Sequence, residues 1–110
     1  MITKLIEYKS ETISRGCVFR FPATWPYESY VDLLVVDMPD EDSGYGLVVT
    51  TGHKAGLILV KLPNECESVS NRSISYQWIL DNWSKWIYPD CNLEDVLILE
   101  HYDEPVYTFK

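Results

Sequence analysis

The sequence predicts an α+β fold: a strongly bent antiparallel sheet, or a small open SH3-like barrel, of five to six strands with one helix in the C-terminal half. Short runs rich in β-branched and aromatic residues recur up to residue 62 and return near the C-terminus. Only residues 73–88 show helical spacing of apolar side chains. The chain has 110 residues, 46% of them hydrophobic, so we expect a single domain over residues 1–110.

The expected strands follow one another along the chain with turn residues between them. Gly16 and Pro22 bound one short run, and a polar cluster precedes Gly44. A loop with a glycine at each end, residues 52–56, predicts a hairpin because glycine accepts the positive φ values of such loops. The predicted strands are residues 2–8, 17–21, 30–37, 45–51, 57–62 and 96–100, with a further edge strand over residues 105–109.

The expected helix begins after Ser73 or Ser75, either of which can cap its first turn, and ends before Pro89. Apolar residues recur at three- and four-residue spacing and form one face of this helix. Trp78 lies off that face, and we expect it to make an edge contact. The members of the apolar face are Tyr76, Ile79, Leu80, Trp83, Trp86 and Ile87.

The formal net charge of −8 is unevenly distributed. Residues 21–53 contain six acids and no Lys or Arg, and residues 86–110 contain six acids against Lys110 alone. Such a surface repels nucleic acid and anionic membranes and attracts a basic partner. The alternative interpretation is that the acidity only maintains solubility.

Three cysteines at wide spacing form neither a disulfide framework nor a zinc motif, and no pattern indicates another metal or a cofactor. No apolar run is long enough to span a membrane, and acids interrupt the N-terminus where a secretory signal is apolar. We therefore expect a cytoplasmic protein.

The sequence offers no catalytic signature, so we predict that the protein is not an enzyme. Cys17 with His53 or His101 could form a nucleophile and base, but no local motif accompanies them. The loop of residues 52–56 lacks the Ser/Thr and the following helix of a phosphate-binding loop.

Four Trp and eight Tyr exceed the needs of one small core, and interfaces favour both residue types. Aromatic residues interleaved with acids predict a surface for a basic protein. The predicted partner-binding residues are Trp25, Tyr27, Asp37, Asp40, Glu41, Asp42, Glu100, Tyr102, Asp103 and Glu104. An alternative interpretation is an adaptor that binds a peptide through the aromatic loop at Trp25 and Tyr27.

Three segments of the sequence are distinctive: FPATWPY at residues 21–27, VTTGHKAGLI at 49–58 and WSKWIYP at 83–89. Together they resemble a family of small immunity proteins from bacterial polymorphic-toxin systems, the family numbered forty-five in that series. The resemblance covers nearly the whole chain, with the segments in matching order. The resemblance implies a non-enzymatic protein that binds and neutralises a cognate toxin domain, with a nuclease as one candidate target. From the acidic charge we expect no nucleic-acid or membrane partner, and we expect a monomer or small homo-oligomer.

Overall fold

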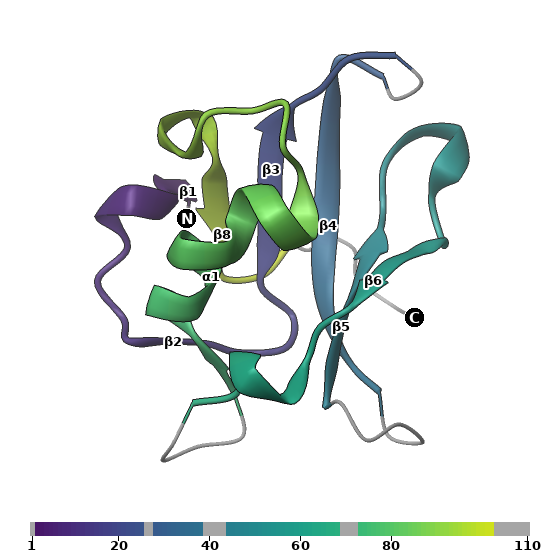
Figure 1. The fold of residues 1–110 in the computed structure, drawn as a ribbon. Coiled ribbons are helices and arrows are strands. Elements are labelled where there is room, and N and C mark those ends of the chain that lie inside the picture. Colours follow the sequence, from purple (N-terminus) through teal and green to yellow (C-terminus); the bar gives the residue numbers. More distant parts are fainter. Residues whose placement is uncertain (1, 26–27, 39–43, 69–72, 103–110) are drawn as a thin grey trace, which may run out of the picture.

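The computed structural model describes residues 2–25, 28–38, 44–68 and 73–102 (Figure 1). Its main element is an open six-stranded sheet in which every pair of neighbours is antiparallel. The strands lie in the order β1 (Ile2–Lys4), β8 (Leu97–Leu99), β3 (Val18–Pro22), β4 (Tyr30–Asp37), β5 (Tyr45–Val49) and β6 (Ile58–Lys61). The predicted α+β class is confirmed, and the sheet does not close into a barrel over the described residues.

The longest strand and the hairpin follow the sequence pattern closely. β4 has the predicted bounds, and β5 and β6 form the predicted hairpin. Gly52 and Gly56 in its loop have φ values of +68° and +98°, the left-handed region that favours glycine. The N-terminal strand is shorter than predicted, because residues Leu5–Glu7 form a 3₁₀ turn, η1, that buries Leu5.

A second sheet, which the sequence pattern did not indicate, pairs β2 (Thr12–Ile13) with β7 (Ile74–Ser75). Two-residue strands are too short to show an alternating pattern, so their pairing depends on tertiary packing. Two further 3₁₀ turns, η3 (Asn64–Cys66) and η5 (Leu93–Asp95), connect the remaining elements. The edge strand predicted at residues 105–109 lies outside the described residues.

The predicted helix is present in the C-terminal half but is not uniform. α1 (Tyr76–Asn82) begins at Ser75, whose Oγ accepts a hydrogen bond from the Trp78 backbone N–H at 3.2 Å. The chain then continues as a π-helical turn, η4 (Trp83–Ile87), before Tyr88 returns to extended backbone. Figure 1 shows α1 lying in front of the main sheet.

The core lies between this helix and the sheet. Trp83 is fully buried, and its ring meets Phe19 and Phe21 of β3 edge to face, at centroid distances of 5.5 and 5.2 Å. Ile79 and Ile87 are buried on the same side. No helix among the described residues is long and apolar enough to cross a membrane.

The opposite face of the sheet carries an apolar row that runs across all six strands. The strand registers align its members as Ile2, Leu99, Val18, Leu34, Val48 and Ile58. Both ends of the row, Ile2 and Ile58, are exposed, whereas Val18 and Leu99 at its centre are buried. A neighbouring row on this face contains Arg20 and Asp32, which are paired in register.

Candidate functional site

The structure describes four of the ten residues predicted to bind a partner. Trp25 is 90% exposed in the loop between β3 and β4, and Glu100 is exposed just after β8. Asp37 ends β4, and Tyr102 lies near the last described residue. The other six, Tyr27, Asp40, Glu41, Asp42, Asp103 and Glu104, lie outside the described residues.

The strand registers place Asp37 and Glu100 at the same end of the sheet. Leu34 of β4 and Leu99 of β8 both pair with Val18 of the intervening β3, so β4 and β8 run parallel two strands apart. The axes of β4 and β8 are therefore separated by roughly 10 Å across the sheet. Asp37, however, forms an ion pair of 2.8 Å with Arg15. Arg15 therefore compensates the charge of Asp37. The count of charges over residues 21–53 could not reveal this, because Arg15 lies outside that segment.

Tyr102 belongs to a polar cluster that the sequence did not indicate, centred on Asp32 of β4. Asp32 is only 1% exposed and accepts two hydrogen bonds from the Arg20 guanidinium, at 2.7 and 2.8 Å. The Tyr102 hydroxyl donates a third at 2.7 Å, and Thr50 Oγ1 lies 2.5 Å from the same hydroxyl. Burial, followed by the bond to Asp32, raises the pKa of Tyr102 to about 12.

This cluster fixes the end of the described chain to the sheet. Arg20 also lies over the Tyr30 ring, with 5.3 Å between the guanidinium carbon and the ring centroid. Because Arg20 and Tyr102 together occupy both carboxylate oxygens of Asp32, the cluster is self-contained. We therefore interpret it as a structural anchor for residues 100–102 rather than as a ligand site.

Cys17 and His53, one of the two candidate catalytic pairs, do not come together. Cys17 lies beside Val35 of β4, with its carbonyl accepting from the Val35 N–H, whereas His53 contacts Glu28 just before the start of that strand. From Tyr30 to Val35, β4 extends roughly 17 Å, so the two groups lie at opposite ends. Burial also raises the pKa of the Cys17 thiol. Within the described ranges, no three His, Cys, Asp or Glu side chains are grouped so as to hold a metal ion.

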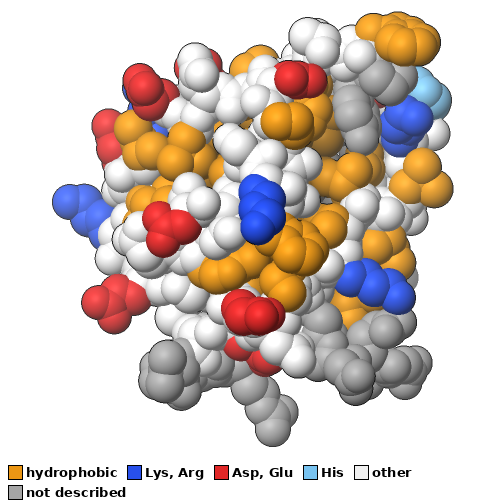
Figure 2. Space-filling model, in the orientation of Figure 1, with side chains coloured by type: hydrophobic (Ala, Val, Ile, Leu, Met, Phe, Trp, Pro, Cys, Tyr) orange, Lys and Arg blue, Asp and Glu red, His pale blue; other side chains and the backbone are white. Residues whose placement is uncertain are grey.

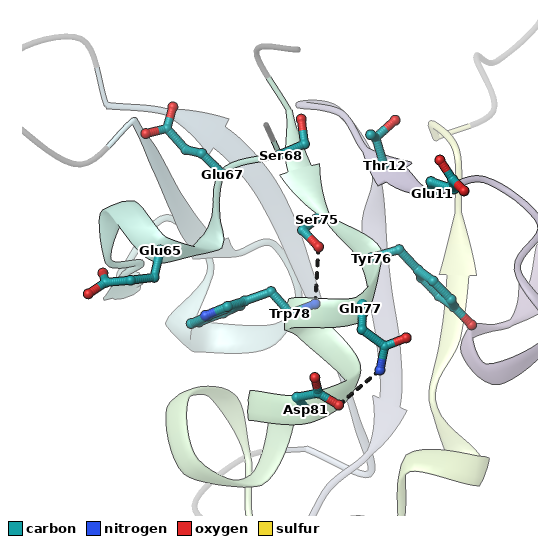
Figure 3. A pocket seen from close by; sticks show the side chains of 10 residues that line it. All are labelled: Glu11, Thr12, Glu65, Glu67, Ser68, Ser75, Tyr76, Gln77, Trp78 and Asp81. Atoms are coloured by element: carbon teal, nitrogen blue, oxygen red, sulfur yellow. Dashed lines mark hydrogen bonds between the residues drawn. The ribbon is translucent and has the colours of Figure 1, made fainter. Parts of the chain in front are cut away.

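A concave surface lies where α1 meets the two-stranded sheet and η3. This acidic hollow has a volume of about 660 Å³. Among the described residues that line it there is no Lys or Arg, and four are acidic: Glu11, Glu65, Glu67 and Asp81. The aromatic lining residues are Tyr76 and Trp78, and the others are Thr12, Ser68, Ser75 and Gln77. Figure 3 shows Glu65, Glu67 and Trp78 on one side of Ser75, and Glu11 and Tyr76 on the other.

The acids of the hollow carry charge that no recorded ion pair compensates. Among the described residues, the ion pairs are Arg15–Asp37, Arg20–Asp32 and His53–Glu28, none of which involves the hollow. Asp81 only accepts a neutral hydrogen bond from Gln77 at 2.9 Å. Glu65 and Glu67 flank the buried Cys66, whose pKa rises to about 12 through burial and then through these two carboxylates.

Aromatic surface continues from the hollow along the helix. The ring of Trp78 lies 6.1 Å from that of Trp86, and both side chains are half-buried. Figure 2 shows hydrophobic side chains gathered over α1 and the following turn, with a Lys or Arg side chain among them and acidic side chains nearby. Trp78, for which the sequence predicted an edge contact, thus lies where the helix borders the hollow. Sequence reasoning missed the hollow itself because its acids come from three separated segments, around residues 11, 65–67 and 81.

The described residues thus form an open α+β fold whose distinctive surfaces are acidic and aromatic. The chain belongs to the family described as Immunity protein 45, whose model matches residues 5–98. The resemblance inferred from the three sequence strings is confirmed, and membership supports an immunity function in general. No curated protein and no solved structure matches the chain.

Proposed function

We propose that this protein protects the cell that makes it by binding a cognate toxin domain and blocking its activity. The family match over residues 5–98 carries this proposal. Neutralisation occurs by protein–protein association, so the protein needs no catalytic group of its own. A standard complex of this kind buries roughly 1,600 Å² in total, which a domain of this size can supply from one face.

The chemistry of the described residues supports binding rather than catalysis. Cys17, Cys66 and Cys91 are buried, and burial raises the pKa of all three thiols, which keeps them in the unreactive protonated form. His53 is engaged by Glu28 at 2.7 Å.

The net charge of −8 supports a basic surface on the toxin as the target. A nuclease fits this requirement, because the groove that binds its phosphate backbone is positively charged. Acidic side chains would occupy the positions of phosphates and accelerate association by electrostatic steering. Within this proposal, the segments around residues 37–42 and 100–104 remain candidate contacts.

Co-purification tests the proposal directly. The protein is expressed with an inactivated toxin domain encoded by the adjacent gene, and the complex is isolated at about 50 mM and about 300 mM salt. We expect a one-to-one complex that weakens as salt rises, together with rescue of growth when the active toxin is expressed. Absence of a complex at both salt concentrations, with no rescue, would contradict the proposed function.

Charge dependence is a separate question. If the complex forms but is insensitive to salt and to the triple change of Asp40, Glu41 and Asp42 to Ala, the binding function stands and the role of that loop is removed. Trp25→Ala, made in parallel, tests the aromatic-loop alternative.

A further inference from the structure

We infer that the toxin contacts the acidic hollow, through a segment that presents Lys or Arg side chains. The inference rests on the proposed function and adds to it the surface and the chemistry of the partner. It concerns residues other than those that the sequence indicated: Glu65, Glu67, Trp78 and Asp81 line the hollow.

The first argument is charge complementarity. Four acidic residues line one concavity, and no Lys or Arg is among the described residues that line it. A basic segment can form charge-assisted hydrogen bonds with these carboxylates, which for Arg can be bidentate. An acidic or apolar partner segment would form none.

The second argument is the aromatic wall. Trp78 is half-buried and supported by Trp86 at 6.1 Å, so its ring presents surface at little conformational cost. A Trp face attracts guanidinium and ammonium groups, and Trp and Arg are the residues most enriched among energetic hot spots. Carboxylates around an aromatic ring therefore suit a Lys or Arg side chain, whose stem is apolar and whose end is charged.

The third argument is rigidity. Each side of the hollow is held by a fully buried neighbour in the chain: Cys66 lies between Glu65 and Glu67, Ile74 precedes Ser75, and Ile79 follows Trp78. The Ser75 cap fixes the first turn of α1 against the hollow. A preformed surface loses less conformational freedom on binding, which increases affinity. At about 660 Å³, the volume is also within the usual range for a binding cleft.

The test compares two triple variants with the same change in charge. One removes three carboxylates from the hollow: Glu65→Gln, Glu67→Gln and Asp81→Asn. The control removes three exposed carboxylates that do not line the hollow, from two 3₁₀ turns that contact one another: Glu7→Gln, Glu94→Gln and Asp95→Asn. Both triples are nearly isosteric, and urea unfolding verifies that each remains folded.

Binding to the inactivated toxin domain is then measured by stopped-flow and biolayer interferometry at the two salt concentrations. We expect the hollow triple to weaken binding by about 30-fold relative to wild type, and the control triple to weaken it by less than about threefold. Trp78→Ala is expected to weaken binding by at least about tenfold, whereas Trp25→Ala leaves it within about twofold.

The outcomes separate the two proposals. If wild type binds and both triples bind equally well, the inference about the hollow is wrong while the proposed function stands. The inference about the hollow is also wrong, and the proposed function still stands, if only the triple change of Asp40, Glu41 and Asp42 disrupts the complex. If wild type neither binds nor protects, both proposals are wrong. Selective loss in the hollow triple supports both.

Discussion

Replacing Tyr102 by Phe removes one hydroxyl from the cluster that attaches residues 100–102 to the sheet. In the wild type this hydroxyl donates to Asp32 Oδ2 at 2.7 Å and lies 2.5 Å from Thr50 Oγ1. The aromatic ring is retained in the variant. Asp32 keeps both bonds from Arg20, at 2.7 and 2.8 Å, so its buried carboxylate remains paired. The substitution therefore isolates the contribution of the phenol.

The expected loss of stability is about 1–2 kcal/mol. A hydrogen bond to a charged group contributes roughly 1.5–3 kcal/mol, and we reduce this value because Tyr102 is 39% exposed and water can partly replace the hydroxyl. The loss stays below the roughly 3–5 kcal/mol for breaking a buried ion pair, since the Arg20–Asp32 pair is intact. For a domain near this size, 1 kcal/mol corresponds to roughly 4–8 °C in Tm.

Urea unfolding followed by tryptophan fluorescence measures this loss, with Tyr30→Phe as the matched control. Tyr30 is also exposed on this face, and its contact with Arg20 is through the ring, which Phe preserves. We expect the control to change the free energy of unfolding by less than about 0.5 kcal/mol. A double-mutant cycle of Tyr102→Phe with Asp32→Asn should give a coupling energy of about 0.5–3 kcal/mol. If Tyr102→Phe matches the control and the coupling is zero, the anchoring role of Tyr102 is refuted.

The same variant changes the dependence of stability on alkaline pH. The pKa of Tyr102 rises from 10.0 in the unfolded chain to about 12 in the folded protein, so folding favours the protonated phenol. Its contribution is fully present below pH 10 and is lost as pH rises from 10 towards about 12. The difference in stability between wild type and Tyr102→Phe should shrink across this window. Tyr8, Tyr45 and Tyr76, whose pKa values are also raised by burial, are common to both proteins and cancel.

Three further predictions test the structure elsewhere. Ser75→Ala removes the cap of α1 and should lower the free energy of unfolding by about 1 kcal/mol in urea, whereas Ser75→Asp, which can still cap, should lose less. The Cys66 thiol, with a pKa of about 12, should react with Ellman's reagent at pH 8 far more slowly in the native protein than in guanidinium; rapid native labelling would contradict its burial. Gly52 and Gly56 both have positive φ, but only at Gly52 would the Cβ of an alanine meet the Glu28 carboxylate. Gly52→Ala should therefore destabilise the protein more than Gly56→Ala, as measured by thermal unfolding. Equal losses in the two variants would contradict the packing of Glu28 against Gly52.

Features set by local chain chemistry could be predicted from the sequence. The β-branched run of residues 30–37 became β4 without change, and the glycines at 52 and 56 marked the hairpin loop. The serine cap and the apolar helix face were also predicted, and Ile79, Trp83 and Ile87 of that face are buried. The π-helical turn over residues 83–87 was not predicted, because the three- and four-residue spacing of apolar side chains does not distinguish it from a continuous α-helix.

Features that depend on pairing between distant segments could not be predicted. Asp32 appeared in the sequence as one of many acids, yet it is buried because Arg20 lies opposite it in register and Tyr102 arrives from the other end of the chain. Asp37 appeared uncompensated until the fold brought Arg15 to it. The acids of the hollow, at positions 11, 65, 67 and 81, are separated by up to 70 residues, so no local charge pattern could group them.

The contrast between the buried Asp32 and the acids of the hollow suggests how one small fold combines a fixed scaffold with an adjustable binding surface. Asp32 is buried, and its charge is matched within the molecule, so its replacement must affect folding. The acids of the hollow are exposed and unmatched within the described ranges, so the fold does not depend on their identity. Their buried neighbours Cys66, Ile74 and Ile79 hold the backbone in place regardless of which side chains project from it. Under the proposed function, substitutions at Glu65, Glu67 and Asp81 would therefore alter toxin preference at little cost in stability, whereas Asp32 would tolerate no such change.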